Sequence, residues 1–253
     1  MPFILVILFF VTAALYASVG FGGGSTYNAL LVLYGADYRI LPSIALLCNI
    51  IVVSGGSFQS WRAGNLRLKR LFPFVVASVP AALAGGLIVV SKLVFVGVLG
   101  FSLLAAGLHL ALDRGVNAVR ETQNFSSLAA AAVGGIIGFI SGLAGIGGGI
   151  FLAPVLYVMR WGKPKEIAGA ASVFILVNSL SGLAGQLTKL HSIGEIELLA
   201  CYWMLFPSVL VGGFIGSRLS NTSLSSLTVK RLTAVLILYV SARLLIRWAG
   251  MLE

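Results

Sequence analysis

The residues best suited to chemistry are two glycine clusters, Gly20-Phe21-Gly22-Gly23-Gly24 and Gly145-Ile146-Gly147-Gly148-Gly149, each inside a long apolar stretch. Glycine costs about 1 kcal/mol relative to alanine in a helix interior, so four glycines in five positions predict a break in the helix. After each break we expect a short apolar helix, at 25–34 and 150–159, whose first N–H groups lack intrahelical acceptors. Because a helix N-terminus carries about half a positive charge, the predicted chemistry is the binding of a small anion by backbone N–H groups.

Polar side chains accompany the two breaks. Asn49 and Asn178 each lie in the middle of an apolar segment, where an unpaired amide is costly. Each amide either donates to a substrate oxygen or to the backbone exposed at a break, and the sequence leaves both roles open. Ser and Thr are weaker candidates, because their hydroxyls usually bond their own helix backbone. The predicted substrate-binding residues are Gly22, Gly23, Gly24, Ser25, Thr26, Asn49, Gly147, Gly148, Gly149, Ile150, Ser172, Asn178 and Gln186.

Other interpretations of these residues are weaker. Contiguous glycines also permit close helix crossing, although spaced small residues would suffice for that. A dinucleotide-binding loop is excluded because no βαβ unit follows Gly20-Phe21-Gly22. No Asp or Glu lies in the middle of an apolar segment, and Ser141 has no His at a corresponding depth to make it a nucleophile. We therefore expect no catalytic residues, no metal ligands, no cofactor and no enzymatic activity.

The elements that position these residues must lie in lipid. Of the 253 residues 59% are apolar and 9% are charged, against about 25% charged in a soluble domain. The net charge of +10 does not indicate nucleic acid, because the Lys and Arg residues lie between apolar segments and mark topology. Besides the broken regions 3–34 and 127–159, stretches long enough to cross about 30 Å of hydrocarbon are expected at 40–58, 71–90, 93–112, 167–188, 198–216 and 232–249.

The two broken regions each begin one of two related halves. Ser43–Asn49 matches Ser172–Asn178, and Pro80–Gly86 matches Pro207–Gly213 in the same order. An internal repeat of this kind is typical of transporters. If each broken region returns to the side that it left, the halves are inverted and twelve of the 17 Lys and Arg residues fall on one side. The positive-inside rule makes that side cytoplasmic and places both termini on the other.

The predicted fold is therefore an all-α polytopic membrane protein with glycine-broken helices. It is an inverted structural repeat with about five helices in each half, counting the arms of a broken helix separately. Residues 1–113 are expected to form the first membrane repeat, 114–125 a connecting loop, and 126–253 the second membrane repeat.

The glycine clusters also carry a family resemblance. Together with Phe151-Leu152-Ala153-Pro154-Val155-Leu156 after the second cluster, the short basic connections and the length, they resemble the TauE/SafE sulfite exporter family over nearly the whole chain. The resemblance implies a bacterial or archaeal inner-membrane permease for sulfite, sulfonates or other small sulfur-containing anions. One departure is that Asn28-Ala29 follows the first cluster where Ala153-Pro154 follows the second, so the half-sites are not equivalent.

We therefore expect a secondary transporter for a sulfur-containing oxyanion such as sulfite, a sulfonate or thiosulfate. In alternating access, the anion would lie at mid-membrane between the two half-helix N-termini. Its expected partners are this substrate and the lipid bilayer. An anion channel on the same scaffold and a non-transporting membrane assembly subunit are the alternatives. The sequence leaves open the direction of transport, a proton or sodium ion as coupling ion, and a homo-oligomer.

Overall fold

The structure is a computed structural model that describes residues 3–18, 20–112, 126–194, 196–219 and 226–252. The predicted connecting loop 114–125 lies outside the described residues. Within the described ranges every regular element is helical. In chain order the elements are α1 (Phe3–Ser18), α2 (Gly24–Leu33), α3 (Leu41–Arg62), α4 (Leu68–Leu87), α5 (Lys92–Leu112), α6 (Ser127–Ala144), α7 (Gly149–Val158), α8 (Pro164–Ser192), the 3₁₀ helix η1 (Ile196–Tyr202), α9 (Leu205–Leu219) and α10 (Ser226–Ala249).

The described helices have the lengths and surfaces of membrane-spanning segments. Five of them, α3, α4, α5, α6 and α8, are long and apolar enough to cross a bilayer, and η1 with α9 would make a sixth span. Large apolar side chains point outward, including Phe72, Ile136 and Ile246, which are 66%, 63% and 70% exposed. Such side chains are costly in water and favourable against lipid. The predicted all-α polytopic membrane fold is confirmed.

Both predicted helix breaks are present. The first separates α1 from α2 and the second separates α6 from α7, and the two short helices have 10 residues each. Each begins one residue earlier than expected. Gly23 and Gly148 precede them with φ of 87° and 80°, in the left-handed region that residues with a Cβ avoid. The glycines are therefore required by the backbone at the start of each short helix.

The stretch predicted to cross the membrane at 198–216 is not a single straight helix. The chain forms η1 and α9 instead, and their axes are bent by 55°. Pro207 explains the interruption, because proline lacks an N–H and its ring clashes with the carbonyl four residues earlier. It is tolerated in the first turn of α9, which therefore begins anew at Leu205.

The helices pack in pairs that relate the two predicted halves. α1 packs against α9 and α6 against α4, while α3 packs against α8 and α5 against α10. Backbones approach closely in the first two pairs. Gly142 of α6 lies against the Ala82 carbonyl of α4, and Gly216 of α9 lies against the Ala14 carbonyl of α1. Small residues at such contacts allow the close helix packing that stabilises membrane bundles.

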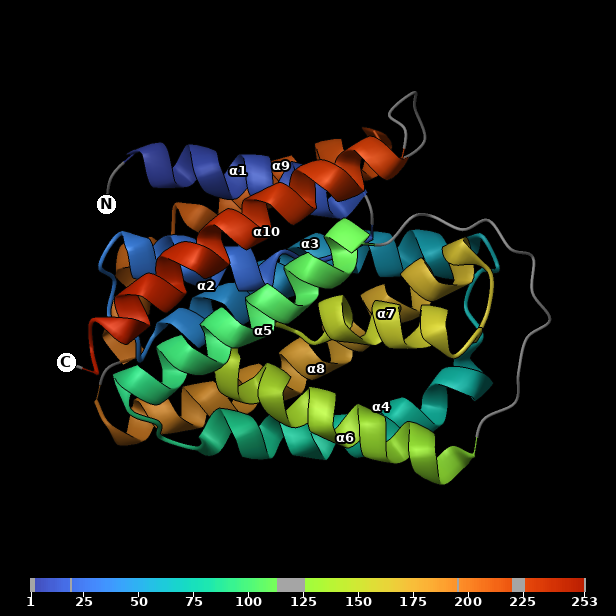
Figure 1. The fold of residues 1–253 in the computed structure, drawn as a ribbon, viewed down its shortest axis with the longest axis horizontal. Helices are drawn as coiled ribbons and strands as arrows, with labels where there is room; N and C mark the ends of the chain where they lie inside the picture. The colour runs from blue at the N-terminus through green and yellow to red at the C-terminus, as the bar shows by residue number, and fades with distance from the viewer. Residues whose placement is uncertain (1–2, 19, 113–125, 195, 220–225, 253) are drawn as a thin grey trace.

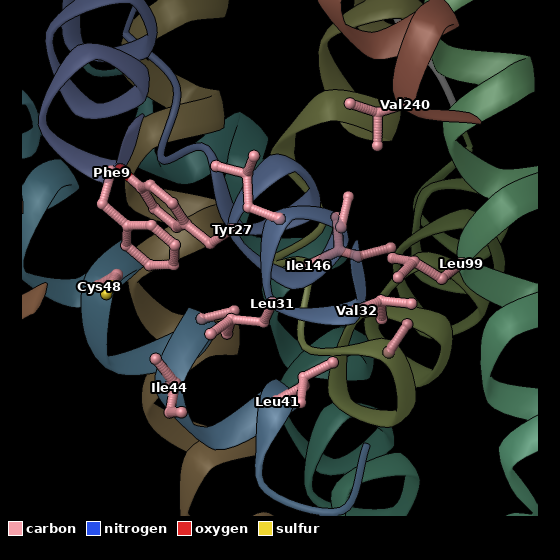
Figure 2. Packing of buried hydrophobic residues seen from close by; sticks show 14 of the residues in the cluster. Phe9, Tyr27, Leu31, Val32, Leu41, Ile44, Cys48, Leu99, Ile146 and Val240 are labelled. Atoms are coloured by element: carbon pink, nitrogen blue, oxygen red, sulfur yellow. The ribbon is translucent and has the colours of Figure 1, made fainter. Parts of the chain in front are cut away.

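The short helix α2 lies in the interior of the bundle. The long helices run along the horizontal axis of Figure 1, where both chain ends lie on the left. Figure 2 shows the surroundings of α2: the rings of Phe9 and Tyr27 stack at 4.7 Å, and Leu31 and Val32 continue the apolar cluster. Ile146 of the second break joins the same cluster. The first half-helix therefore packs directly against the second break.

Candidate functional site

The two breaks and one side chain between them form a buried junction, which we define as Gly22–Ser25, Gly145–Ile150 and Asn49. Gly22–Ser25 and Gly145–Gly149 are buried, and Asn49 is 0% exposed. A Cβ added to Gly24 would lie 2.9 Å from the Ile146 carbonyl oxygen, so the start of α2 touches the second break directly. The two breaks therefore meet inside the protein and face neither lipid nor opposite ends.

The junction holds backbone donors without acceptors. Within the described part of the chain, no hydrogen bond is made by the N–H groups of Gly22, Gly23, Gly24 and Ser25, or by those of Gly147, Gly148, Gly149 and Ile150. Neither half-helix has a side-chain cap. Buried N–H groups are nearly always paired in proteins, so a cluster of unpaired ones calls for an acceptor.

Asn49 links the two breaks. Its Nδ2 donates to the Ile146 carbonyl at 3.0 Å, and the same amide contacts Gly22 and Gly24. A Cβ added to Gly147 would lie 2.6 Å from Nδ2. Asn49 Oδ1 is buried without a partner among the described residues. The sequence left open whether Asn49 bonds the substrate or the backbone exposed at a break. In this structure it bonds exposed backbone, and that backbone belongs to the break in the other predicted half.

Asn178, the sequence counterpart of Asn49, is bonded differently. Its Nδ2 donates at 2.8 Å to the Phe174 carbonyl, one turn earlier in its own helix. In the same helix, the neighbouring Ser179 lies beside the second break instead, with its Oγ 3.0 Å from a Cβ added to Gly147. The structure thus brings Asn49 together with the glycines and pairs Asn178 with its own helix.

Three further polar side chains hold the carbonyl groups that the breaks expose. Ser172 Oγ donates to the Gly20 carbonyl at 2.7 Å, and Gln186 Nε2 donates to the Gly142 carbonyl at 2.8 Å. Asn28 Nδ2 reaches from α2 to the Ala144 and Gly145 carbonyls, at 2.7 and 3.1 Å. Ser172 and Gln186 were predicted as substrate contacts, and in this structure their donors are occupied by backbone.

The remaining predicted residues occupy the first turns of the half-helices. Ser25 is buried in the first turn of α2, and Thr26 shares a hydrogen bond of 2.7 Å with the Tyr16 hydroxyl. Gly149 packs on Ile175, and Ile150 is half-buried at the start of α7. Sequence reasoning missed Asn28, Tyr16 and Ser179. The signal for Asn28 was its mismatch with Ala153 in the other half.

Dipoles dominate the electrostatics of the junction. Among the described residues, Lys189 is the one charged side chain in the buried set, and it lies outside the junction. The donors at the junction are therefore backbone N–H groups at two helix N-termini, with about half a positive charge each. The described residues contain no group of three or more His, Cys, Asp or Glu side chains suited to a metal ion. Such an arrangement can bind a small anion through hydrogen bonds.

Comparisons with known proteins show the family to which the chain belongs. A family model described as Sulfite exporter TauE/SafE matches residues 5–244. The chain is 30% identical over 244 residues to the probable membrane transporter protein y4hK of Sinorhizobium fredii, covering 95% of this chain and 97% of that protein. It is 28% identical over 229 residues to the probable membrane transporter protein YjnA of Bacillus subtilis, covering 82% and 87%. No solved structure matches the chain.

Proposed function

The chain belongs to the TauE/SafE sulfite exporter family and is a multi-pass membrane transporter, and on that premise we propose that it carries a small sulfur-containing oxyanion such as sulfite, thiosulfate or a sulfonate. The family membership confirms the resemblance seen in the glycine clusters. We further propose that transport is by alternating access and that both termini lie outside the cytoplasm.

One observation carries the choice of an anion. Eight backbone N–H groups at the two converging half-helix starts have no acceptor within the described residues. An oxyanion offers several acceptor oxygens to such donors, and helix N-termini bind sulfate and phosphate for this reason. Partial dipole charges also suit a transporter, because they hold the anion without the deep trap of a buried fixed cation.

The burial of the junction supports alternating access. Asn49 and the buried glycines are closed off from both ends in this conformation, whereas an open anion channel needs a continuous water path. The packing pairs support a two-fold relation between halves, since α1 on α9 corresponds to α6 on α4. We propose that the two inverted repeats move around the junction and expose it to one side at a time.

The distribution of basic residues supports one orientation in the membrane. Both chain ends lie at one end of the bundle in Figure 1. The connections at the opposite end hold most of the basic residues, including Arg62, Arg67 and Arg70. We place that end in the cytoplasm and the termini outside, in the inner membrane. A C-terminal alkaline phosphatase fusion should be active, because that enzyme needs oxidising conditions to form its disulfides; an inactive fusion would reverse the orientation.

The function is tested with purified wild-type protein. A thermal-shift screen against sulfite, thiosulfate, sulfoacetate, taurine and sulfate should show stabilisation by at least one sulfur anion, because a ligand that binds only the folded state raises apparent stability. Proteoliposomes preloaded with that anion should then accumulate its ³⁵S-labelled form by counterflow. Flux without counterflow would indicate a channel. Neither binding nor flux for any of these anions would indicate an assembly subunit and refute the proposal.

A further inference from the structure

A narrow cleft is lined by residues from the α2–α3 connection, the α4–α5 connection and the end of α8. These segments lie at the end of the bundle where Figure 1 marks both chain ends. The residues that line the cleft include Arg39, Pro42, Phe95, Leu143, Lys189 and Ile193. Its walls are largely apolar, so the two basic side chains dominate its electrostatics.

The inner end of the cleft lies close to the second break without including it. Leu143 belongs to the last turn of α6, two residues before Gly145. Pro42 packs on the break itself, since a Cβ added to Gly145 would lie 2.7 Å from Pro42 Cβ. The cleft is therefore separated from the junction by Pro42 and the last turn of α6.

Among the described residues, no side chain is paired with the charge of Lys189. The residue is 8% exposed, and among the described residues its ammonium makes no hydrogen bond or ion pair. Arg39 differs, because its guanidinium binds the Asp37 carboxylate at 3.0 and 3.1 Å. The Arg39 hydrogen bond holds the pKa of Asp37 below its ordinary value, so this pair stays ionised and neutral overall at pH 7. One positive charge remains in the cleft.

We infer that Lys189 is the recruitment site for the transported anion, a cation in the terminus-side cleft that concentrates a sulfur oxyanion next to the second glycine break. The inference rests on the proposed function. A cleft with one sign of charge and apolar walls focuses the field and raises the local concentration of an oppositely charged substrate. Lys189 binds at the entrance only, so release from the junction still depends on dipoles.

A purely structural role makes a different prediction. Lys189 lies in the last turn of α8, where a cation interacts favourably with the helix dipole and its long stem can bury apolar carbons. In that case removing the charge would lower thermal stability and leave the transport KM unchanged. The recruitment role predicts the opposite pattern.

The variants Lys189→Gln and Lys189→Arg separate these roles. Initial rates of ³⁵S-sulfite and ³⁵S-thiosulfate uptake into proteoliposomes should show a KM raised about tenfold in Lys189→Gln, with maximal rate nearly kept. Lys189→Arg should stay close to wild type. The matched control is Lys92→Gln, which removes an exposed charge at the start of α5, and its KM should change little. An unchanged KM in Lys189→Gln would overturn the inference.

A second measurement needs no variant. Amidination of wild-type lysines by methyl acetimidate, followed by mass spectrometry, should be slowed at Lys189 by thiosulfate and unaffected at exposed Lys92. Equal modification of Lys189 with and without saturating thiosulfate would overturn the inference even if Lys189→Gln failed to fold. Absence of wild-type flux with protection at Lys189 intact would instead refute the proposed transport and leave an anion site in the cleft.

Discussion

The two glycine breaks occupy matching places in the two predicted halves, yet the side chains around them differ. At the first break, Ser172 of the other half holds the Gly20 carbonyl. At the second break, Asn28 and Asn49 of the other half hold the Ala144, Gly145 and Ile146 carbonyls. The carbonyl groups of each break are thus secured by side chains that cross from the opposite half.

This comparison separates the features that the two predicted halves share from those in which they differ. Both halves keep the left-handed glycine and the unpaired N–H groups, which only the backbone can supply. The amides have diverged: Asn49 bridges the breaks, whereas Asn178 bonds its own helix. An anion at the junction would accordingly meet a two-fold set of backbone donors within an asymmetric set of side chains.

The largest expected effect is on the shared feature, the left-handed glycines. Gly148→Leu and Gly23→Leu should each lower transport by about a hundredfold, because a shift of about 1 Å at a site can cost that much. The backbone at both positions is strained for any residue with a Cβ, and the Cβ at Gly148 would lie 2.9 Å from the Phe174 ring. The measurement is ³⁵S-sulfite uptake by proteoliposomes.

The control for these variants is Gly55→Leu in α3, where a Cβ meets no atom within 4 Å. It should transport like wild type. If Gly23→Leu were inactive and Gly148→Leu fully active, only the first half-helix would bind the anion, and the two-fold donor set would be wrong.

The next effect concerns the diverged amides. Asn49→Ala leaves the buried Ile146 carbonyl unpaired, which should lower the free energy of unfolding by about 1–3 kcal/mol. It should also reduce the thermal shift produced by thiosulfate. Asn178→Ala removes only a bond to a carbonyl of its own helix, so its effect should be smaller. Thermal unfolding with and without thiosulfate measures both; equal losses in the two variants would contradict the assigned asymmetry.

Much of the fold could be predicted from the sequence because local rules determine it. Glycine clusters break helices and apolar length sets a span, so α3, α5 and both half-helices lie within a few residues of their expected positions. The bend between η1 and α9 escaped prediction. Pro80 and Pro207 are matched in sequence, but Pro80 lies inside α4 while Pro207 lies in the first turn of α9. The presence of a proline does not predict whether a helix continues through that residue or begins near it.

The junction was less predictable, because its hydrogen bonds join residues far apart in sequence. Asn49 and the glycines could be found from their types, but Asn28 bonds a carbonyl 116 residues away. Its partner depends on where the end of α6 lies relative to α2, which no local pattern encodes. The mismatch between Asn28 and Ala153 indicated that the two predicted halves differ. It did not indicate which residues Asn28 contacts.

That mismatch supplies the third test. Asn28→Ala should lower the free energy of unfolding by about 1–2 kcal/mol, because two buried carbonyl groups lose their donor. Ala153→Asn, the reciprocal change, should also destabilise, since it places an amide at a site that is 3% exposed. Thermal unfolding in detergent measures both changes. If Ala153→Asn were stabilising, the first break would accept the same cross-half bond as the second, and the asymmetry would be accidental.

The smallest expected effect separates two serines matched by the repeat, Ser172 and Ser43. Ser172→Ala removes the donor to the Gly20 carbonyl and should cost about 0.5–1.5 kcal/mol of unfolding free energy. Ser43 is buried with an unpartnered Oγ among the described residues, so Ser43→Ala should be neutral or stabilising. Thermal unfolding compares the two. A larger loss of unfolding free energy in Ser43→Ala than in Ser172→Ala would mean that the Ser43 hydroxyl also bonds the backbone of the second break. The two serines would then have equivalent roles, contrary to the contacts described here.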